Sequence, residues 1–180
     1  LEHLCSAQPF YLREASGYRL DGDEIDDEIE QQVSDQIAPD RRVVLHMVVH
    51  SKTGLRAPSA DAAVRLRNQF SDRLMILVDA AQGRLAPADI RRALNAGFAV
   101  IFTGSKFYSG PPFSGALLLP KQWAGDPGPL PEALSKWFDR DSMPEHWTAA
   151  TASITQQHNP GLALRWAAAE AEFDAYHQIP

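Results

Sequence analysis

The chain has few of the features that mark secreted, membrane and nucleic-acid-binding proteins. Its single cysteine, Cys5, cannot form an internal disulfide, which agrees with a reducing compartment. No run of about 18 apolar residues occurs, and the N-terminus lacks the basic start and apolar core of a signal peptide. These absences predict a cytoplasmic protein with no membrane partner.

Acidic residues outnumber basic ones in this chain, 23 to 17. The formal net charge is -6 at pH 7, whereas nucleic-acid surfaces are built from clustered lysine and arginine. The run Gly104-Ser105-Lys106 lacks the spacing of a nucleotide-binding P-loop, and Gly97 lies too far upstream to complete that motif. We therefore expect no nucleic-acid partner and find no motif for a kinase or an ATPase.

What the chain does contain is an alternation of apolar runs and amphipathic stretches. Its 180 residues are 44% hydrophobic and 22% charged, which is typical of one globular domain. Crossover helices of ten or more residues imply a mainly parallel sheet covered on both faces, so the predicted fold class is α/β. Strands are predicted over 42–49, 74–78, 98–102 and 114–119, and helices over 21–38, 60–71, 87–96 and 160–177.

The continuous apolar run 43–49 predicts a strand that is buried on both faces. Asp21 or Asp23 is expected to cap the first helix, and Ser59 the helix that follows the first strand. Ligands of parallel sheets bind beyond the carboxyl ends of the strands. Ser51, Asp79 and the run 103–106 each come directly after a predicted strand and are therefore expected along one edge.

A carboxylate and a lysine follow successive predicted strands. Asp79 lies in Val78-Asp79-Ala80-Ala81-Gln82. Lys106 is the fourth residue after the next predicted strand, which ends at 102. Pyridoxal phosphate requires a lysine amine for its aldehyde and a carboxylate beside its ring nitrogen. At about 4 Å such a carboxylate stabilises the protonated ring by roughly 4 kcal/mol at an effective dielectric of 20. Taken singly, Asp79 could end a strand and Lys106 could be a solvated surface group; the pair favours the cofactor.

Further polar side chains accompany these two residues. Gln82 shares a short turn with Asp79 and could reach the phenolic oxygen of the same cofactor. Thr103 and Ser105 place hydroxyl groups beside Lys106, suited to a phosphate or its neighbours. The side chains themselves therefore predict a cofactor-binding set of Asp79, Gln82, Thr103, Ser105 and Lys106.

These motifs resemble the fold-type I pyridoxal-phosphate enzymes, and specifically the class V aminotransferase and cysteine desulfurase-like superfamily. In that family Asp-x-x-Gln or Asp-x-x-His precedes Ser-x-His-Lys by one βα unit, and 79–82 and 103–106 stand in those places. Glu2-His3 resembles the family's upstream Glu-His pair, which implies that His3 stacks on the cofactor ring. Ser51 stands at the family's Asn-x-x-Gly asparagine, which implies that Ser51 also binds the cofactor, near its phenolic oxygen or the substrate. Ser105 replaces the histidine usual before the lysine.

The resemblance implies a function and a domain plan. It implies a three-layer α/β/α sandwich in which Lys106 forms the internal aldimine and Asp79 holds the pyridinium. The substrate would be an amino acid or related amine and the enzyme an aminotransferase, with lyase or desulfurase chemistry open. The full-length protein would be a homodimer. Residues 1–180 would be part of the large domain, without the N-terminal phosphate-loop segment or the C-terminal small domain. Residues 160–180 would form the helix that leads toward the small domain.

An alternative class of function stays open. Because the phosphate loop is absent, the chain could be a truncated or degenerate α/β domain with a structural or interaction role and no catalysis of its own. The histidines His46 and His50 are interpreted as packing and loop residues, because two histidines without a third ligand do not make a metal site. Cys5 does not stand where the family's catalytic cysteine lies, after the lysine.

Overall fold

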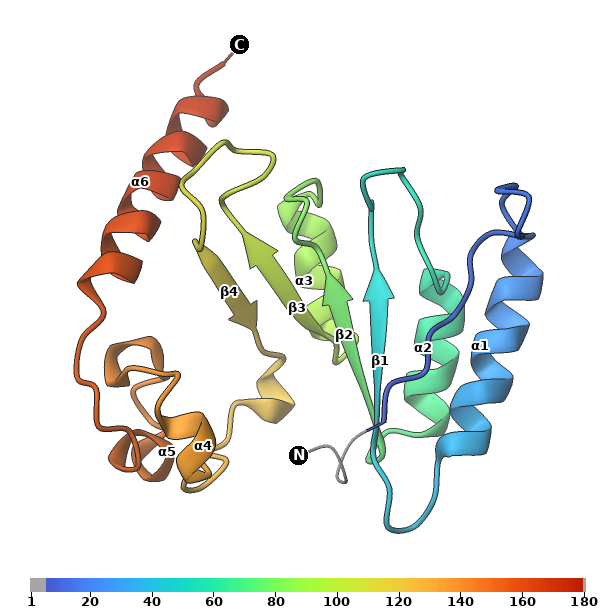
Figure 1. Cartoon of the computed structure of the whole chain (residues 1–180), viewed down its shortest axis with the longest axis horizontal. Helices are drawn as coiled ribbons and strands as arrows, with labels where there is room; N and C mark the ends of the chain where they lie inside the picture. The colour runs from blue at the N-terminus through green and yellow to red at the C-terminus, as the bar shows by residue number, and fades with distance from the viewer. Residues whose placement is uncertain (1–5, 180) are drawn as a thin grey trace. The chain divides into compact units, whose positions relative to one another are not determined.

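The computed structural model describes residues 6–179, and the chain forms two compact units, Leu1–Asp79 and Ala80–Pro180 (Figure 1). Helices and strands alternate along both units, which confirms the predicted α/β class. None of the helices within residues 6–179 combines the length and the apolar character that crossing a membrane requires.

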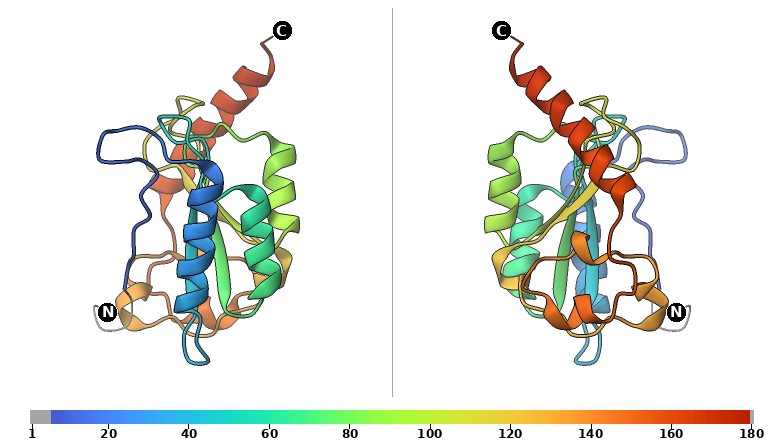
Figure 2. Two further views of the ribbon diagram at one scale, coloured as in Figure 1. Left: turned by 90° about the vertical axis from the view of Figure 1, so that its right-hand side faces the viewer. Right: turned by 90° about the vertical axis from the view of Figure 1, so that its left-hand side faces the viewer.

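The first unit consists of two parallel strands and two helices. Its elements are α1 (Gly22–Gln36), β1 (Val43–Val48), α2 (Ala60–Gln69) and β2 (Leu74–Asp79). The parallel register runs from Val43 opposite Leu74 to Val48 opposite Asp79. Helix α2 lies along one face of the strand pair (Figure 2), where it contacts β2, and α1 contacts both α2 and β1. This is the β–α–β order that the sequence predicted.

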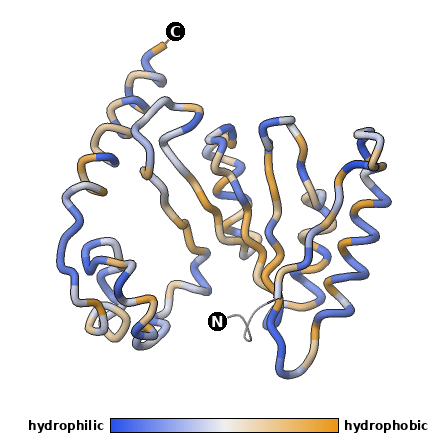
Figure 3. Tube along the Cα trace, in the orientation of Figure 1, coloured by the Kyte–Doolittle hydropathy of each residue, from blue (hydrophilic) through white to orange (hydrophobic). Residues whose placement is uncertain are grey.

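The strands of the first unit are apolar along their length (Figure 3), yet only one of their faces is buried. Leu45 and Met47 are 3% and 4% exposed, whereas Val44 is 58% exposed. The prediction of a first strand buried on both faces is therefore wrong. Side chains alternate between the faces of a strand, so a continuous apolar run does not show how many faces the helices cover.

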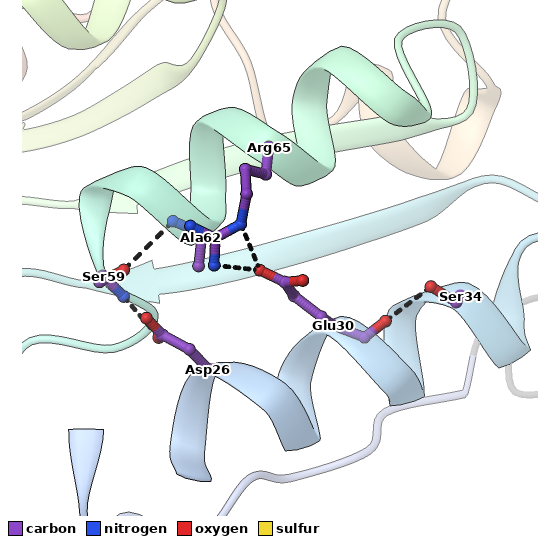
Figure 4. A network of polar contacts seen from close by, with 6 residues as sticks. All are labelled: Asp26, Glu30, Ser34, Ser59, Ala62 and Arg65. Atoms are coloured by element: carbon purple, nitrogen blue, oxygen red, sulfur yellow. Dashed lines mark hydrogen bonds and ion pairs between the residues drawn. The ribbon is translucent and has the colours of Figure 1, made fainter. Parts of the chain in front are cut away.

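Helices α1 and α2 are joined by polar contacts (Figure 4). The buried Asp26 carboxylate accepts a hydrogen bond from the Ser59 backbone N–H at 2.8 Å. The Ser59 hydroxyl oxygen accepts from the Ala62 N–H at 3.1 Å, which confirms the predicted cap of α2. Arg65 donates to Glu30 Oε1 from Nε and Nη2, at 3.0 and 2.6 Å. One predicted cap thus also serves as a link between two helices.

The second unit contains an antiparallel strand pair and a long C-terminal helix. Its regular elements are α3 (Pro87–Asn95), β3 (Ala99–Thr103), β4 (Gly115–Leu118) and α6 (Pro160–His177). The register of β3 and β4 runs from Val100 opposite Leu118 to Thr103 opposite Gly115. The segment 104–114 between them contains no helix, so it reverses the chain instead of making a parallel crossover.

Short elements fill the connection between β4 and α6. Asp126 ties this connection together, because its carboxylate accepts backbone hydrogen bonds from Ala149, Ala150 and Gly128. The bond from Ala149 is the main reason why the pKa of Asp126 is lowered. The elements are η1 (Lys121–Trp123), α4 (Glu132–Ser135), η2 (Arg140–Ser142) and α5 (Thr148–Ala152).

Candidate functional site

The predicted site residues belong to different units of the chain. Ser51 and Asp79 lie in the first unit, and Gln82, Thr103, Ser105 and Lys106 lie in the second. His3, the predicted ring-stacking residue, lies outside the described residues.

Asp79 is the last residue of β2, and its side chain is 32% exposed. Its Oδ2 atom lies 3.4 Å from Nε2 of His46, which belongs to β1. The backbone oxygen of Asp79 accepts a hydrogen bond from the Val49 N–H at 3.2 Å. The carboxylate therefore stands at a strand end, as predicted. It also lies beside His46, which was interpreted from the sequence as a packing residue.

Ser51 organises the loop after β1. Its hydroxyl oxygen accepts hydrogen bonds from the Leu55 N–H at 3.0 Å and from the Thr53 N–H at 3.3 Å. The preceding residue, His50, has a φ of 52°, which is uncommon for a residue with a side chain. The short side chain of Ser51 thus holds its own turn, and its predicted contact with the cofactor or the substrate stays a prediction.

The turn that carries Gln82 packs against the loop that carries Lys106. The N–H of Gly83 donates to the Ala80 carbonyl at 2.8 Å, and Gly83 has a φ of 70°. A Cβ atom at Gly83 would lie 3.2 Å from Cβ of Phe107, the residue after Lys106. Glycine therefore allows this close approach, and two of the predicted segments lie side by side within the second unit.

Hydrogen bonds of Thr103 close the base of the Lys106 loop, the segment 104–114 between β3 and β4. The Thr103 hydroxyl, 9% exposed, lies 3.0 Å from the Ser114 carbonyl oxygen, to which it donates. Its oxygen accepts from the Ser105 N–H at 3.2 Å and lies 2.8 Å from the Ser105 hydroxyl. These bonds give Thr103 a role in closing the loop, and its predicted contact with the cofactor stays a prediction.

Residues with unusual backbone angles occur in the same loop. Ser109 has a φ of 60° and Phe113 a φ of 66°. A positive φ is strained for a bulky residue such as Phe113, and strain of this kind is concentrated at functional sites. The Lys106 side chain itself is exposed, and no residue within 6–179 forms an ion pair with it.

Helix α6 fixes this loop through close contacts at two glycines. A Cβ atom at Gly104 would lie 2.6 Å from Cβ of Ala169, and one at Gly110 would lie 3.0 Å from the same atom. Ala169 is fully buried. Arg165, one turn earlier on α6, places its guanidinium 5.8 Å from the ring centroid of Phe113. The loop is therefore clamped against one face of α6.

Aromatic rings extend this contact toward the end of α6. The Tyr108 ring lies 4.4 Å from that of Phe173 and 5.4 Å from that of Tyr176, measured between centroids. Phe102 and Phe107 also pack on the rings of α6, at 5.8 and 5.3 Å. Burial in this cluster is the main cause that raises the pKa of the Tyr108 phenol. The ring contacts hold the two residues that follow Lys106.

No protein-family model, curated protein or solved structure matches the chain.

The hollows of the first unit lie away from the predicted residues. A cleft of about 850 Å³ runs between α1, β1 and the segment 6–12, and a second of about 660 Å³ lies around Arg42 and Arg73. Neither is lined by Ser51 or Asp79, although His46 lines the larger one. Within residues 6–179 no group of three or more histidine, cysteine or acidic side chains could hold a metal ion.

The side chains at these positions fit the chemical needs of pyridoxal phosphate. Lys106 carries an exposed amine that forms no ion pair with any residue of 6–179, and a carboxylate stands at the end of β2. Gln82 and Ser105 are half-buried and carry an amide and a hydroxyl. The residue that sequence reasoning missed is His46. Its side chain shares a face with that of Asp79 through the register of β1 and β2, which the sequence does not record.

Proposed function

We propose that the chain is part of a pyridoxal-phosphate-dependent enzyme of the class V aminotransferase type, with Lys106 as the residue that holds the cofactor. The observation that carries the proposal is the Lys106 loop. Three residues beyond β3 it presents an exposed lysine that forms no ion pair among the described residues, on a strained backbone that packs against α6. A rigid support of this kind is what an accurately placed reactive group needs.

The residues would divide the work as follows. When bound, pyridoxal phosphate supplies an aldehyde for amine exchange and a ring that accepts electrons. The Asp79 carboxylate would keep the ring nitrogen protonated, while Gln82 and Ser51 would donate hydrogen bonds near the phenolic oxygen. The Lys106 amine, once released by an incoming amino acid or amine, would take up and return a proton at the substrate carbon.

Further parts of the proposal follow from the resemblance or, for the parallel sheet and the location, from the sequence pattern. They are a three-layer sandwich with a mainly parallel sheet, a homodimer, a cytoplasmic location, and a ring-stacking role for His3. Ser105 in place of a histidine leaves amino transfer, lyase and desulfurase-type chemistry as reaction classes. The proposal also includes the assignment of residues 1–180 to the large domain of such an enzyme.

Absorbance spectroscopy of the chain titrated with pyridoxal phosphate tests the proposal. We expect a visible band that differs from that of the free cofactor, because a bond to a lysine changes the chromophore. Lys106→Ala should lose this band, whereas Lys121→Ala, which removes another exposed lysine, should keep it. No band in the wild-type chain, or an equal band in the Lys106→Ala variant, would contradict the proposal.

One observation favours a second candidate function, that of an interaction domain without catalysis. On the face of the β1–β2 pair that α2 does not cover, Val44 and Met75 are 58% and 41% exposed. Apolar side chains on a sheet face are commonly covered by another protein segment. A chain that binds no pyridoxal phosphate in the titration would support this second function.

A further inference from the structure

His46 and Asp79 lie on the same face of the β1–β2 pair. In the parallel register Val48 stands opposite Asp79, and His46 precedes Val48 by two residues, so the side chains of all three point to one side. The opposite face contains the buried side chains of both strands. His46 and Asp79 thus belong to the face that α2 does not cover.

The contact between His46 and Asp79 joins one ring nitrogen to one carboxylate oxygen. Nε2 of His46 lies 3.4 Å from Oδ2 of Asp79, and the two side chains are 54% and 32% exposed. A carboxylate at the end of a strand can rotate about its side-chain bonds, and a neighbouring donor reduces that freedom. An imidazole with its proton on Nε2 is such a donor.

We infer that His46 is a positioning residue that orients the Asp79 carboxylate through Nε2. This inference rests on the proposed function, in which Asp79 acts on the ring nitrogen of the cofactor. A neutral imidazole suits this role better than a cation would, because it places an N–H beside the Asp79 carboxylate without neutralising the negative charge that the ring needs. His46 itself does not touch the reacting atoms.

NMR of the imidazole nitrogens in the cofactor-free chain tests the contact itself. Asp79→Asn should shift the Nε2 resonance of His46 and leave that of His158 unchanged. The matched control is Asp141→Asn, because Nδ1 of His158 lies 2.5 Å from Oδ2 of Asp141. That variant should shift the His158 resonances alone. A His46 resonance unchanged by Asp79→Asn would overturn the inference, whether or not the chain binds the cofactor.

Cofactor affinity tests the purpose of the contact. We expect His46→Ala to weaken pyridoxal phosphate binding by about tenfold, as loss of a group that orients a ligand typically does. His46→Gln, which keeps a donor, should restore most of the affinity. In the Asp79→Asn background, His46→Ala should have no further effect, because the charge that it orients is gone.

The outcomes separate the inference from the proposed function. An equal loss of affinity in His46→Ala and His46→Gln, or a full effect of His46→Ala in the Asp79→Asn background, would overturn the positioning role. A wild-type chain that binds no pyridoxal phosphate would overturn the proposed function, while the NMR result still decides whether His46 orients Asp79. Circular dichroism of each variant shows whether the fold is kept.

Discussion

Hydroxyl groups close three of the segments on which the two units depend. Ser51 closes the loop after β1, Ser59 caps α2, and Thr103 closes the Lys106 loop. Each hydroxyl replaces a missing backbone partner at the end of a strand or a helix. At the scale of single residues, the structural role of these three side chains is to bind backbone groups.

Loss of the Ser59 hydroxyl should destabilise the first unit. Ser59→Ala leaves the Ala62 N–H without its cap, and we expect the free energy of unfolding to fall by about 1 kcal/mol. Denaturation by urea measures this change. Ser34→Ala is the matched control, because the exposed Ser34 hydroxyl bonds only to the Glu30 carbonyl within the same helix. An equal loss in both variants would contradict the role assigned to the cap.

Local residue roles could be predicted from the sequence, and long-range ones could not. Asp21 and Ser59 follow the rule for helix caps, which depends only on neighbouring residues, and both predictions are confirmed. The contact of His46 with Asp79 depends on strand register and on the side chain's direction. Both residues could be named from the sequence, but their pairing could not be predicted from it.

The Lys106 loop and α6 act as one structural element of the second unit. The predicted helix over 160–177 is confirmed at both ends by α6. Its contacts with Gly104 and Gly110 were not predicted, because residues some sixty positions apart meet only in the folded chain. In the same way, β4 was predicted as a strand but not as the antiparallel partner of β3, since no periodicity records strand direction.

A methyl group at Gly104 should disturb this element. Gly104→Ala would place Cβ 2.6 Å from Cβ of Ala169, so α6 or the loop must shift. We expect a loss of about 1–3 kcal/mol in the free energy of unfolding, as for other overpacked positions. Gly125→Ala is the control, because a Cβ atom there meets nothing within 4 Å. Equal stability of the two variants would show that α6 does not clamp the loop.

At the scale of the whole molecule, the alternation of elements predicted the α/β class, but the number of covered strand faces could not be predicted. The run 43–49 is apolar at nearly every position, and only contacts with the helices decide that Leu45 is buried and Val44 exposed. The candidate site has the same limit. Its residues follow strand ends, as the sequence predicted, and their joint action on a cofactor is the central claim of the proposal.

Chemical trapping of the cofactor tests that claim most directly. The chain has four lysines, Lys52, Lys106, Lys121 and Lys136. Borohydride reduction of the chain with one equivalent of pyridoxal phosphate fixes the cofactor on the lysine that holds it, and peptide mass spectrometry then identifies that residue. The account predicts label on Lys106 alone. Label spread evenly over the four lysines, or absent from Lys106, would contradict it.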